Sequence, residues 1–201
     1  MRHLLLMLVL LISGCVSTEV VQREIEQCPQ YFQDNVGEAK ILPIWSAVIP
    51  LVGGPIGWLN EDGSYTLTSL ANRDVLLHEA FHSVDFWIYQ HRRDEHNRFV
   101  AAWGGVPAPQ LALYLICAAV PIVSKVPVPG HVNLYGCSNG MEDAAETFVF
   151  WMRGKKRNDK KLMNKCAAIE SFVNGAYSDG TQAVPGHIYD PKLLIATASD
   201  E

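Results

Sequence analysis

Residues 75–88 read VLLHEAFHSVDFWI, and this stretch decides the fold. Apolar side chains flank His78, Glu79 and His82 on both sides, so the stretch predicts a helix that is largely buried. A buried imidazole or carboxylate needs a partner, because leaving one unpaired in the interior costs several kcal/mol. A bound metal ion would supply that partner.

His78 and His82 belong to an HExxH pattern, whose spacing suits a single metal ion. Residues four apart lie one turn apart on the same helix face, so both imidazoles can reach one ion. Glu79 lies beside that ion, where it can take a proton from a metal-bound water. Two imidazoles, a carboxylate and one open position are typical of catalytic zinc, so we expect one Zn²⁺ here. The pattern alone also fits a helix with two surface histidines.

A second acidic segment offers a candidate for the third ligand. Residues 142–151 read EDAAETFVFW and predict another buried helix, with Glu142 and Glu146 one turn apart. The pair resembles that of the gluzincin metalloproteases, in which a glutamate on a second helix is the third zinc ligand. By that resemblance Glu142 binds the metal and Glu146 orients His78 through a hydrogen bond. The alternative is a solvated acidic helix face, although the segment has little other polar surface.

Residues 135–148 extend the resemblance to a narrower family. They read YGCSNGMEDAAETF and match the form Y-G-x-x-N-x-x-E-x-x-A-E-x-F. This form is similar to that of anthrax lethal factor and the clostridial Pro-Pro endopeptidases, and Asp85 completes the related form H-E-x-x-H-x-x-D. The resemblance is confined to these two motif regions. It implies a zincin-like domain of the gluzincin type.

The same resemblance implies roles for Tyr135 and Asp85. In that family the tyrosine hydroxyl faces the oxyanion of the tetrahedral intermediate, and a fixed donor there is worth about 3–4 kcal/mol. Tyr135 is therefore the expected oxyanion donor, and the alternative is a loop tyrosine that covers the core. Asp85 either holds His82 in its orientation or caps a local turn.

The first residues of the chain predict export. A short basic start precedes an apolar stretch from Leu4 to Ile12, which is followed by Ser13-Gly14-Cys15, as in a secretory signal. This end resembles a bacterial lipobox, which implies that residues 1–14 are removed and that acylated Cys15 is held in a lipid bilayer. Valine rather than aspartate at position 16 implies an outer-membrane anchor facing the periplasm. An ordinary signal peptide with a coincidental cysteine is the alternative.

The rest of the chain predicts a tether at 15–23 and one domain at 24–201. The interval between the two motif regions is longer than we expect for the family, with the excess at 103–129. That part contains an apolar run at 111–123, which is too short to cross a bilayer, since a span takes about 20 residues. It predicts a buried helix, or else a surface that dips into the membrane or binds an apolar partner.

For the domain we expect an α+β, zincin-like fold that is mainly helical with a small sheet. Strands are predicted at Ile41–Ile49 and Gly57–Thr68. The part from 63 to 68 directly precedes the HExxH helix, and we expect it to be the edge strand with which a peptide substrate pairs. Thr68 or Ser69 is expected to cap that helix.

Four cysteines remain after acylation, at Cys28, Cys117, Cys137 and Cys166. An even number in an exported chain predicts two disulfides, for which three pairings exist. Zinc ligation is the alternative, but none of the four has CxxC spacing. Cys137 follows Tyr135 closely and is expected to pin the loop that carries it.

The charge of the chain argues against one class of partner. The formal net charge is −5, and no cluster of lysine and arginine is long enough to suggest nucleic-acid binding. The motifs instead predict a zinc-dependent endopeptidase that hydrolyses a peptide or protein substrate outside the cytoplasm, with Glu79 activating water and Tyr135 supporting the oxyanion. One alternative is a non-catalytic zinc-binding lipoprotein that binds a partner. Another is a hydrolase of cell-wall peptide cross-links.

Overall fold

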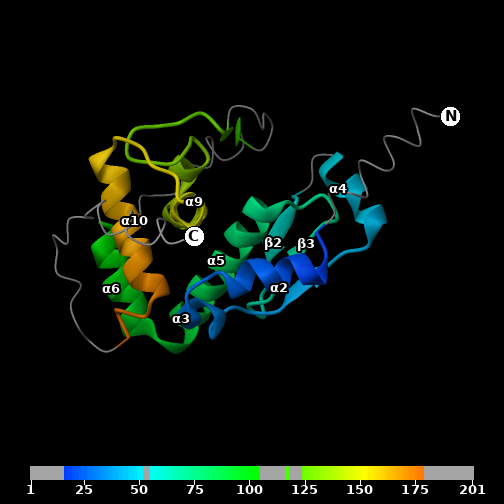
Figure 1. Ribbon diagram of the computed structural model, residues 1–201, viewed down its shortest axis with the longest axis horizontal. Coiled ribbons are helices and arrows are strands. Elements are labelled where there is room, and N and C mark those ends of the chain that lie inside the picture. The colour runs from blue at the N-terminus through cyan, green and yellow to red at the C-terminus, as the bar shows by residue number, and fades with distance from the viewer. Residues whose placement is uncertain (1–15, 52–54, 105–115, 118–123, 179–201) are drawn as a thin grey trace, which may run out of the picture.

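The computed structural model describes residues 16–51, 55–104, 116–117 and 124–178 (Figure 1). Within these residues the fold is mixed α+β and mainly helical, as expected. The long helix α5 carries the HExxH motif and lies between two groups of elements (Figure 1). The sheet and α2 pack on one side of it, and α6 and α9 pack on the other. The elements are α2 (Thr18–Glu26), α3 (Gln30–Gln33), β1 (Ala39–Ile41), η1 (Ile44–Ala47), α4 (Val48–Leu51), β2 (Gly57–Leu59), β3 (Tyr65–Leu67), α5 (Arg73–His91), α6 (Arg93–Trp103), η2 (Gly136–Ser138), α9 (Gly140–Met152) and α10 (Lys160–Val173).

The three strands form one sheet in the order β1-β3-β2. β3 pairs in parallel with β1, with Ala39 opposite Tyr65, and antiparallel with β2, with Gly57 opposite Leu67. The prediction that the strand just before the HExxH helix is an edge strand is therefore wrong, because β3 is the central strand. All three of its residues are buried, as is typical of a strand with a partner on each side. The edge strand that contacts α5 is β2.

Two predicted boundaries also differ from the structure. The strand expected at Ile41–Ile49 ends at Ile41, and a 3-10 helix begins after Pro43. Proline has no N–H to donate to a sheet, so it cannot continue the ladder there. Helix α5 is capped by Asn72, not by Thr68 or Ser69, because the Asn72 side chain accepts hydrogen bonds from the backbone at positions 74 and 75 at 2.9 and 3.0 Å.

The segment expected to be a tether belongs to the folded domain from residue 16 onward. Val16 and Val21 are buried in the core, and Ser17 caps α2. Glu24 is only 2% exposed and lies 3.1 Å from both Arg73 and Arg153. These contacts fix α2 against the start of α5 and the end of α9, so residues 16–23 belong to the domain and do not form the expected tether.

An aromatic cluster fixes α5 against the helices that follow it. Phe81 of α5 packs on Phe148 of α9 with ring centroids 5.1 Å apart, and Phe148 stacks on Phe32 at 4.8 Å. Phe99 of α6 stacks on Phe172 of α10 at 4.2 Å, and Phe81 contacts both rings. All five side chains are nearly or fully buried. Because close-packed cores resist sliding, this cluster holds the HExxH helix and the acidic helix in one relative position.

A buried serine fixes the opposite side of α5 to the sheet. Ser83 accepts a hydrogen bond from the Gly37 N–H at 2.8 Å and donates one to the Gly63 carbonyl at 2.5 Å. Gly37 precedes β1 in the sequence, and Gly63 precedes β3. The sheet and the HExxH helix are therefore joined by polar bonds as well as by packing.

The expected disulfides are not present among the described cysteines. Cys28, Cys117, Cys137 and Cys166 are all free thiols. Cys28 and Cys166 lie in separate hydrophobic clusters, and burial raises the pKa of each thiol to about 12. Such cysteines behave as small apolar core residues and not as reactive groups.

Several predictions fall outside the described residues. They concern the signal segment 1–14, Cys15 and most of the insertion at 103–129. Among the helices that the structure describes, none is long and apolar enough to cross a membrane.

Candidate metal centre

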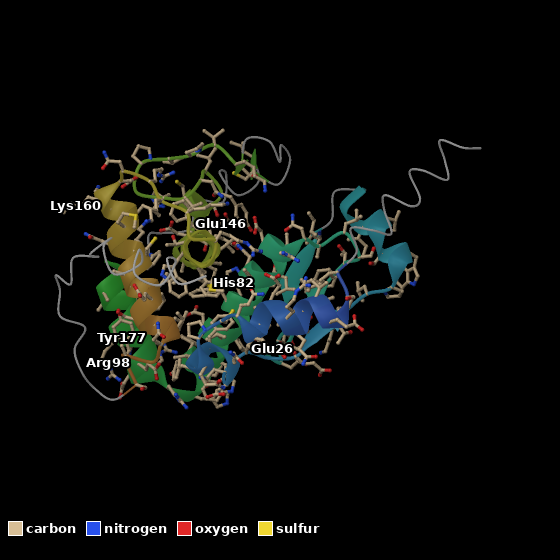
Figure 2. The ribbon with its side chains drawn as sticks, in the orientation of Figure 1. Glu26, His82, Arg98, Glu146, Lys160 and Tyr177 are labelled. Carbon is tan, nitrogen blue, oxygen red and sulfur yellow. The ribbon has the colours of Figure 1, made fainter. Side chains whose placement is uncertain are left out.

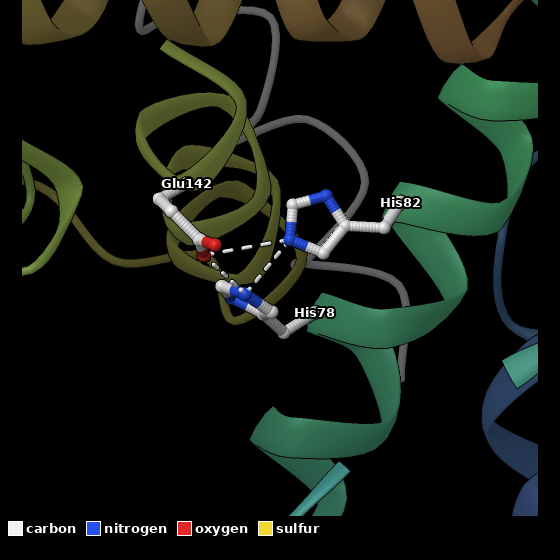
Figure 3. A group of neighbouring side chains, drawn as sticks. All are labelled: His78, His82 and Glu142. Carbon is white, nitrogen blue, oxygen red and sulfur yellow. Dashed lines mark hydrogen bonds and ion pairs between the residues drawn. The ribbon is translucent and has the colours of Figure 1, made fainter. Parts of the chain in front are cut away.

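Helix α5 places two histidines side by side in the interior. His78 and His82 are 8% and 7% exposed, and their Nε2 atoms are 3.1 Å apart (Figure 3). The two rings meet edge to face, with centroids 4.7 Å apart. This arrangement follows directly from the four-residue spacing on a helix, which stacks one side chain above the other.

Glu142 reaches the same point from the first turn of α9. Asn139 caps that helix, and its side chain accepts hydrogen bonds from the Met141 and Glu142 N–H groups at 2.9 Å each. Glu142 Oε2 lies 2.9 Å from His78 Nε2 and 3.4 Å from His82 Nε2 (Figure 3). The donor atoms of the three residues all lie within 4.8 Å of one another, so the cluster could hold a metal ion.

The carboxylates strongly favour a positive charge at this point. Burial alone would lower the pKa of His78, but Glu142 and Glu146 outweigh it and raise the pKa to about 10. Burial alone would raise the pKa of Glu142, but hydrogen bonds with His78 and His82 hold it well below its usual value. A metal ion bound here would replace the proton on His78, so binding would release protons.

Glu146 lies next to His78 Nδ1, where the resemblance predicts a residue that orients the ring. Its Oε1 atom is 3.2 Å from His78 Nδ1, on the side of the ring away from Glu142. Its Oε2 atom accepts a hydrogen bond from the Asn133 side chain at 2.5 Å. Contacts of this kind fix the tautomer and the orientation of a metal-binding imidazole.

Asp85 does not form a hydrogen bond with His82, so the prediction that it holds that ring in its orientation is wrong. Asp85 Oδ1 lies 3.3 Å from Nε2 of His96 on α6. Among the described residues, His82 Nδ1 has no hydrogen-bond partner. Position 85 is three residues after His82, but its side chain turns toward α6, which packs against α5.

Glu79 is buried close to the histidines but outside the donor cluster. It is 9% exposed, and burial raises its pKa, with partial compensation from His78 and His82. A Cβ atom at Gly57 of β2 would lie 2.8 Å from Glu79 Cγ and 3.2 Å from Oε1. The backbone of the edge strand therefore lies directly against this carboxyl group. A carboxyl whose pKa is raised by burial suits general acid–base chemistry.

Tyr135 lies at the start of η2, beside the first histidine. Its ring centroid is 6.0 Å from that of His78, and the ring planes are tilted by 40°. Its backbone N–H donates to the Ser124 carbonyl at 3.2 Å. The structure thus brings Tyr135 together with the candidate ligands from a loop that is remote from α5 in sequence.

The sequence did not reveal two further residues of this site. Gly57 lets the edge strand approach Glu79, and a glycine within a strand is a weak signal of such close approach. Asn133 joins Glu146 to the tyrosine-bearing loop, since its Oδ1 atom accepts from the Gly136 N–H at 2.9 Å. No pattern around position 133 distinguishes it from an ordinary loop asparagine.

Comparison with known proteins gives no relative from which a function could be transferred. No family model matches the chain, and neither a curated protein nor a solved structure is significantly similar to it.

Proposed function

We propose that this protein is a zinc-dependent endopeptidase of the gluzincin type, related to anthrax lethal factor and the Pro-Pro endopeptidases. One observation carries the proposal. His78, His82 and Glu142 direct three donor atoms to one buried point, with Glu79 beside it. The fold proposed for it is zincin-like, in which an HExxH helix and a second helix supply the ligands.

The donor set fits zinc in type and in spacing. Two imidazole nitrogens and a carboxylate oxygen are the usual protein ligands of a catalytic zinc site. Zinc–ligand bonds of about 2.0–2.1 Å in a tetrahedron put neighbouring donors roughly 3.4 Å apart. The three donor atoms lie 2.9, 3.1 and 3.4 Å apart. Little movement is needed for them to bind one ion.

Each polar residue of the site has a role in peptide hydrolysis. Zinc, when bound, would polarise the scissile carbonyl and lower the pKa of a water molecule. Glu79 accepts the proton of the attacking water at its carboxylate and then delivers a proton to the leaving amine. Tyr135 donates a hydrogen bond where the carbonyl oxygen becomes negatively charged. Glu146 holds His78 in the orientation that binding requires.

The position of β2 supports an extended peptide as the substrate. Among the described strands β2 pairs only with β3, and its Gly57 lies against Glu79. We infer that the substrate pairs with the other edge of β2. The main chain of a peptide that paired with this edge would run past Glu79, the proposed base. In this proposal β2 takes the role that the sequence suggested for the segment before the helix.

Replacing Gly57 with alanine is expected to impair catalysis and not metal binding. The new methyl group would lie 2.8 Å from Glu79 Cγ, so the carboxyl group must move. We expect kcat to fall by about 10–100-fold, because small displacements of a catalytic group are costly. Zinc content should stay close to that of the parent chain, whereas overpacking of this buried contact should lower the midpoint of thermal unfolding. An unchanged kcat would show that Glu79 does not act from this position.

We also propose that the protein acts at a bacterial envelope surface. Acylation of Cys15 would hold the chain to a lipid bilayer, on the periplasmic side of an outer membrane. Val16 is already buried in the domain, so such an anchor would keep the domain close to the lipid surface. Export in this form agrees with a substrate outside the cytoplasm.

Digestion of a diverse peptide library tests the function. The chain should cleave internal bonds, lose this activity when a chelator removes the metal, and regain it when zinc is added. Cleavage that survives chelation would contradict the proposal. Zinc binding without cleavage of any peptide, including cell-wall cross-link peptides, would instead support the non-catalytic lipoprotein.

A further inference from the structure

Tyr135 is carried by a loop, residues 124–139, that we call the tyrosine loop. Between described residues, its backbone hydrogen bonds join the loop to itself and to the first turn of α9. The Leu134 N–H donates to the Val126 carbonyl at 2.8 Å, and the Tyr135 N–H donates to the Ser124 carbonyl at 3.2 Å. A loop whose backbone bonds are internal needs side chains from elsewhere to fix its position.

Arg157, in the connection between α9 and α10, holds the tyrosine loop by its carbonyl groups. Its guanidinium donates to the Val128 carbonyl at 2.9 Å and to the Val132 carbonyl at 3.0 Å, and it also donates to the His131 carbonyl. The rigid planar fork of an arginine can satisfy several acceptors at once, which a lysine cannot do.

Two further side chains bind the N–H and the carbonyl group of Gly130. The Gly130 N–H donates to Asp159 at 2.6 Å, and its carbonyl accepts from Lys165 at 2.7 Å. Lys165 also forms an ion pair with Asp143, whose side chain is 1% exposed and whose Oδ1 atom lies 2.9 Å from His131 Nδ1. Separating the members of such a buried pair would leave an unpaired charge, which is strongly destabilising. The ion pair of Lys165 and Asp143 therefore resists displacement.

Asn133 links the anchored part of the tyrosine loop to the candidate metal centre. It directly follows the stretch that Arg157 and Lys165 hold. Its side-chain amide donates to Glu146, the partner of His78, and its side-chain oxygen accepts from the Gly136 N–H next to Tyr135. A shift of residues 128–132 would therefore move the turn that holds the tyrosine ring. Glu146 belongs to α9, so it stays beside His78 when the loop shifts.

We propose that Arg157 is a positioning residue, which acts through the tyrosine loop to hold Tyr135 beside His78. Asp159, Lys165 and Asp143 complete the same anchor. The inference rests on the proposed function, because it assigns Tyr135 a catalytic hydrogen bond. It adds that this hydrogen bond is prearranged by a charged anchor that touches neither the substrate nor the metal.

The test is a double-mutant cycle between Arg157 and Tyr135 in the otherwise intact chain. Arg157→Ala should lower kcat by about 10–100-fold, with KM and zinc content unchanged. Tyr135→Phe should lower kcat by about 10²–10³-fold. In the double variant, the loss should stay within about twofold of Tyr135→Phe alone, because Arg157 has nothing left to position. Losses that multiply would overturn the inference.

Arg98 offers a matched control. It is also a part-buried arginine that donates to a main-chain carbonyl, that of Tyr177, but it lies on α6, away from Glu146 (Figure 2). Arg98→Ala should leave kcat close to that of the parent chain. Arg157→Lys keeps the charge but loses part of the fork, so its kcat should lie between those of the parent and Arg157→Ala.

Hydrogen exchange gives a readout that does not depend on peptide hydrolysis. The amides of Gly130, Tyr135 and Gly136 should exchange faster in Arg157→Ala than in the parent chain, while Arg98→Ala should not change them. If the parent chain cleaves no peptide, the proposed function fails and this measurement alone decides the anchoring role. Unchanged exchange at these amides in both Arg157 variants would overturn it.

Discussion

Glu79→Ala is expected to abolish peptide hydrolysis while the protein keeps its zinc. Glu79 is buried beside the donor cluster but contributes no atom to it. Loss of a general acid–base residue typically lowers the rate by about 10²–10⁴-fold, and the proposed mechanism uses Glu79 first as the base and then as the acid. The measurements are kcat on one cleaved peptide and moles of zinc per mole of protein.

Glu79→Gln separates the chemistry from the packing at this position. The amide has nearly the same shape as the carboxyl group that lies against Gly57, but it cannot accept a proton from water. It should be as inactive as Glu79→Ala and as stable as the parent chain. Substantial hydrolysis by either variant would remove Glu79 from the mechanism.

Glu142→Ala is expected to lose zinc and, with it, activity. The substitution removes one of the three proposed ligands and, among the described residues, leaves only His78 and His82 to supply donor atoms at this point. Loss of a residue that merely orients a ligand costs about 10–100-fold in affinity, so the loss of a ligand should exceed 100-fold. Competition with a coloured chelator measures the zinc affinity of each variant.

Glu61→Ala is a suitable control, because Glu61 is exposed in the turn between β2 and β3. It should bind zinc as the parent chain does. Equal zinc affinity in Glu79→Ala and Glu142→Ala would contradict the ligand assignment, because only one of the two residues belongs to the donor cluster.

The local parts of the site could be predicted from the sequence. The spacing of His78 and His82 on one helix determines that their side chains meet, whatever surrounds them. The two buried helices follow from their apolar periodicity, and α9 lies close to its expected position. The position of Glu142 relative to the histidines came from a resemblance, because no local rule brings two remote helices together.

The parts that failed depend on contacts between remote segments. β3 is central because β1 pairs with it in parallel, a pairing that no local signal in the short strand at Ala39–Ile41 reveals. Asp85 has the right spacing to support His82, yet α6 packs so close to α5 that Asp85 pairs with His96 instead. The cysteine count predicted disulfides, whereas Cys28 and Cys166 are buried in separate hydrophobic clusters as free thiols.

Zinc-edge X-ray absorption of the purified chain tests the proposed metal centre most directly. The proposal predicts one zinc ion per chain, with two imidazole ligands and the remaining ligands oxygen, and loss of this signal in Glu142→Ala. A spectrum dominated by sulfur ligands would contradict it, because it would place zinc on cysteines and not at His78, His82 and Glu142. A parent chain that binds no zinc would contradict it as well.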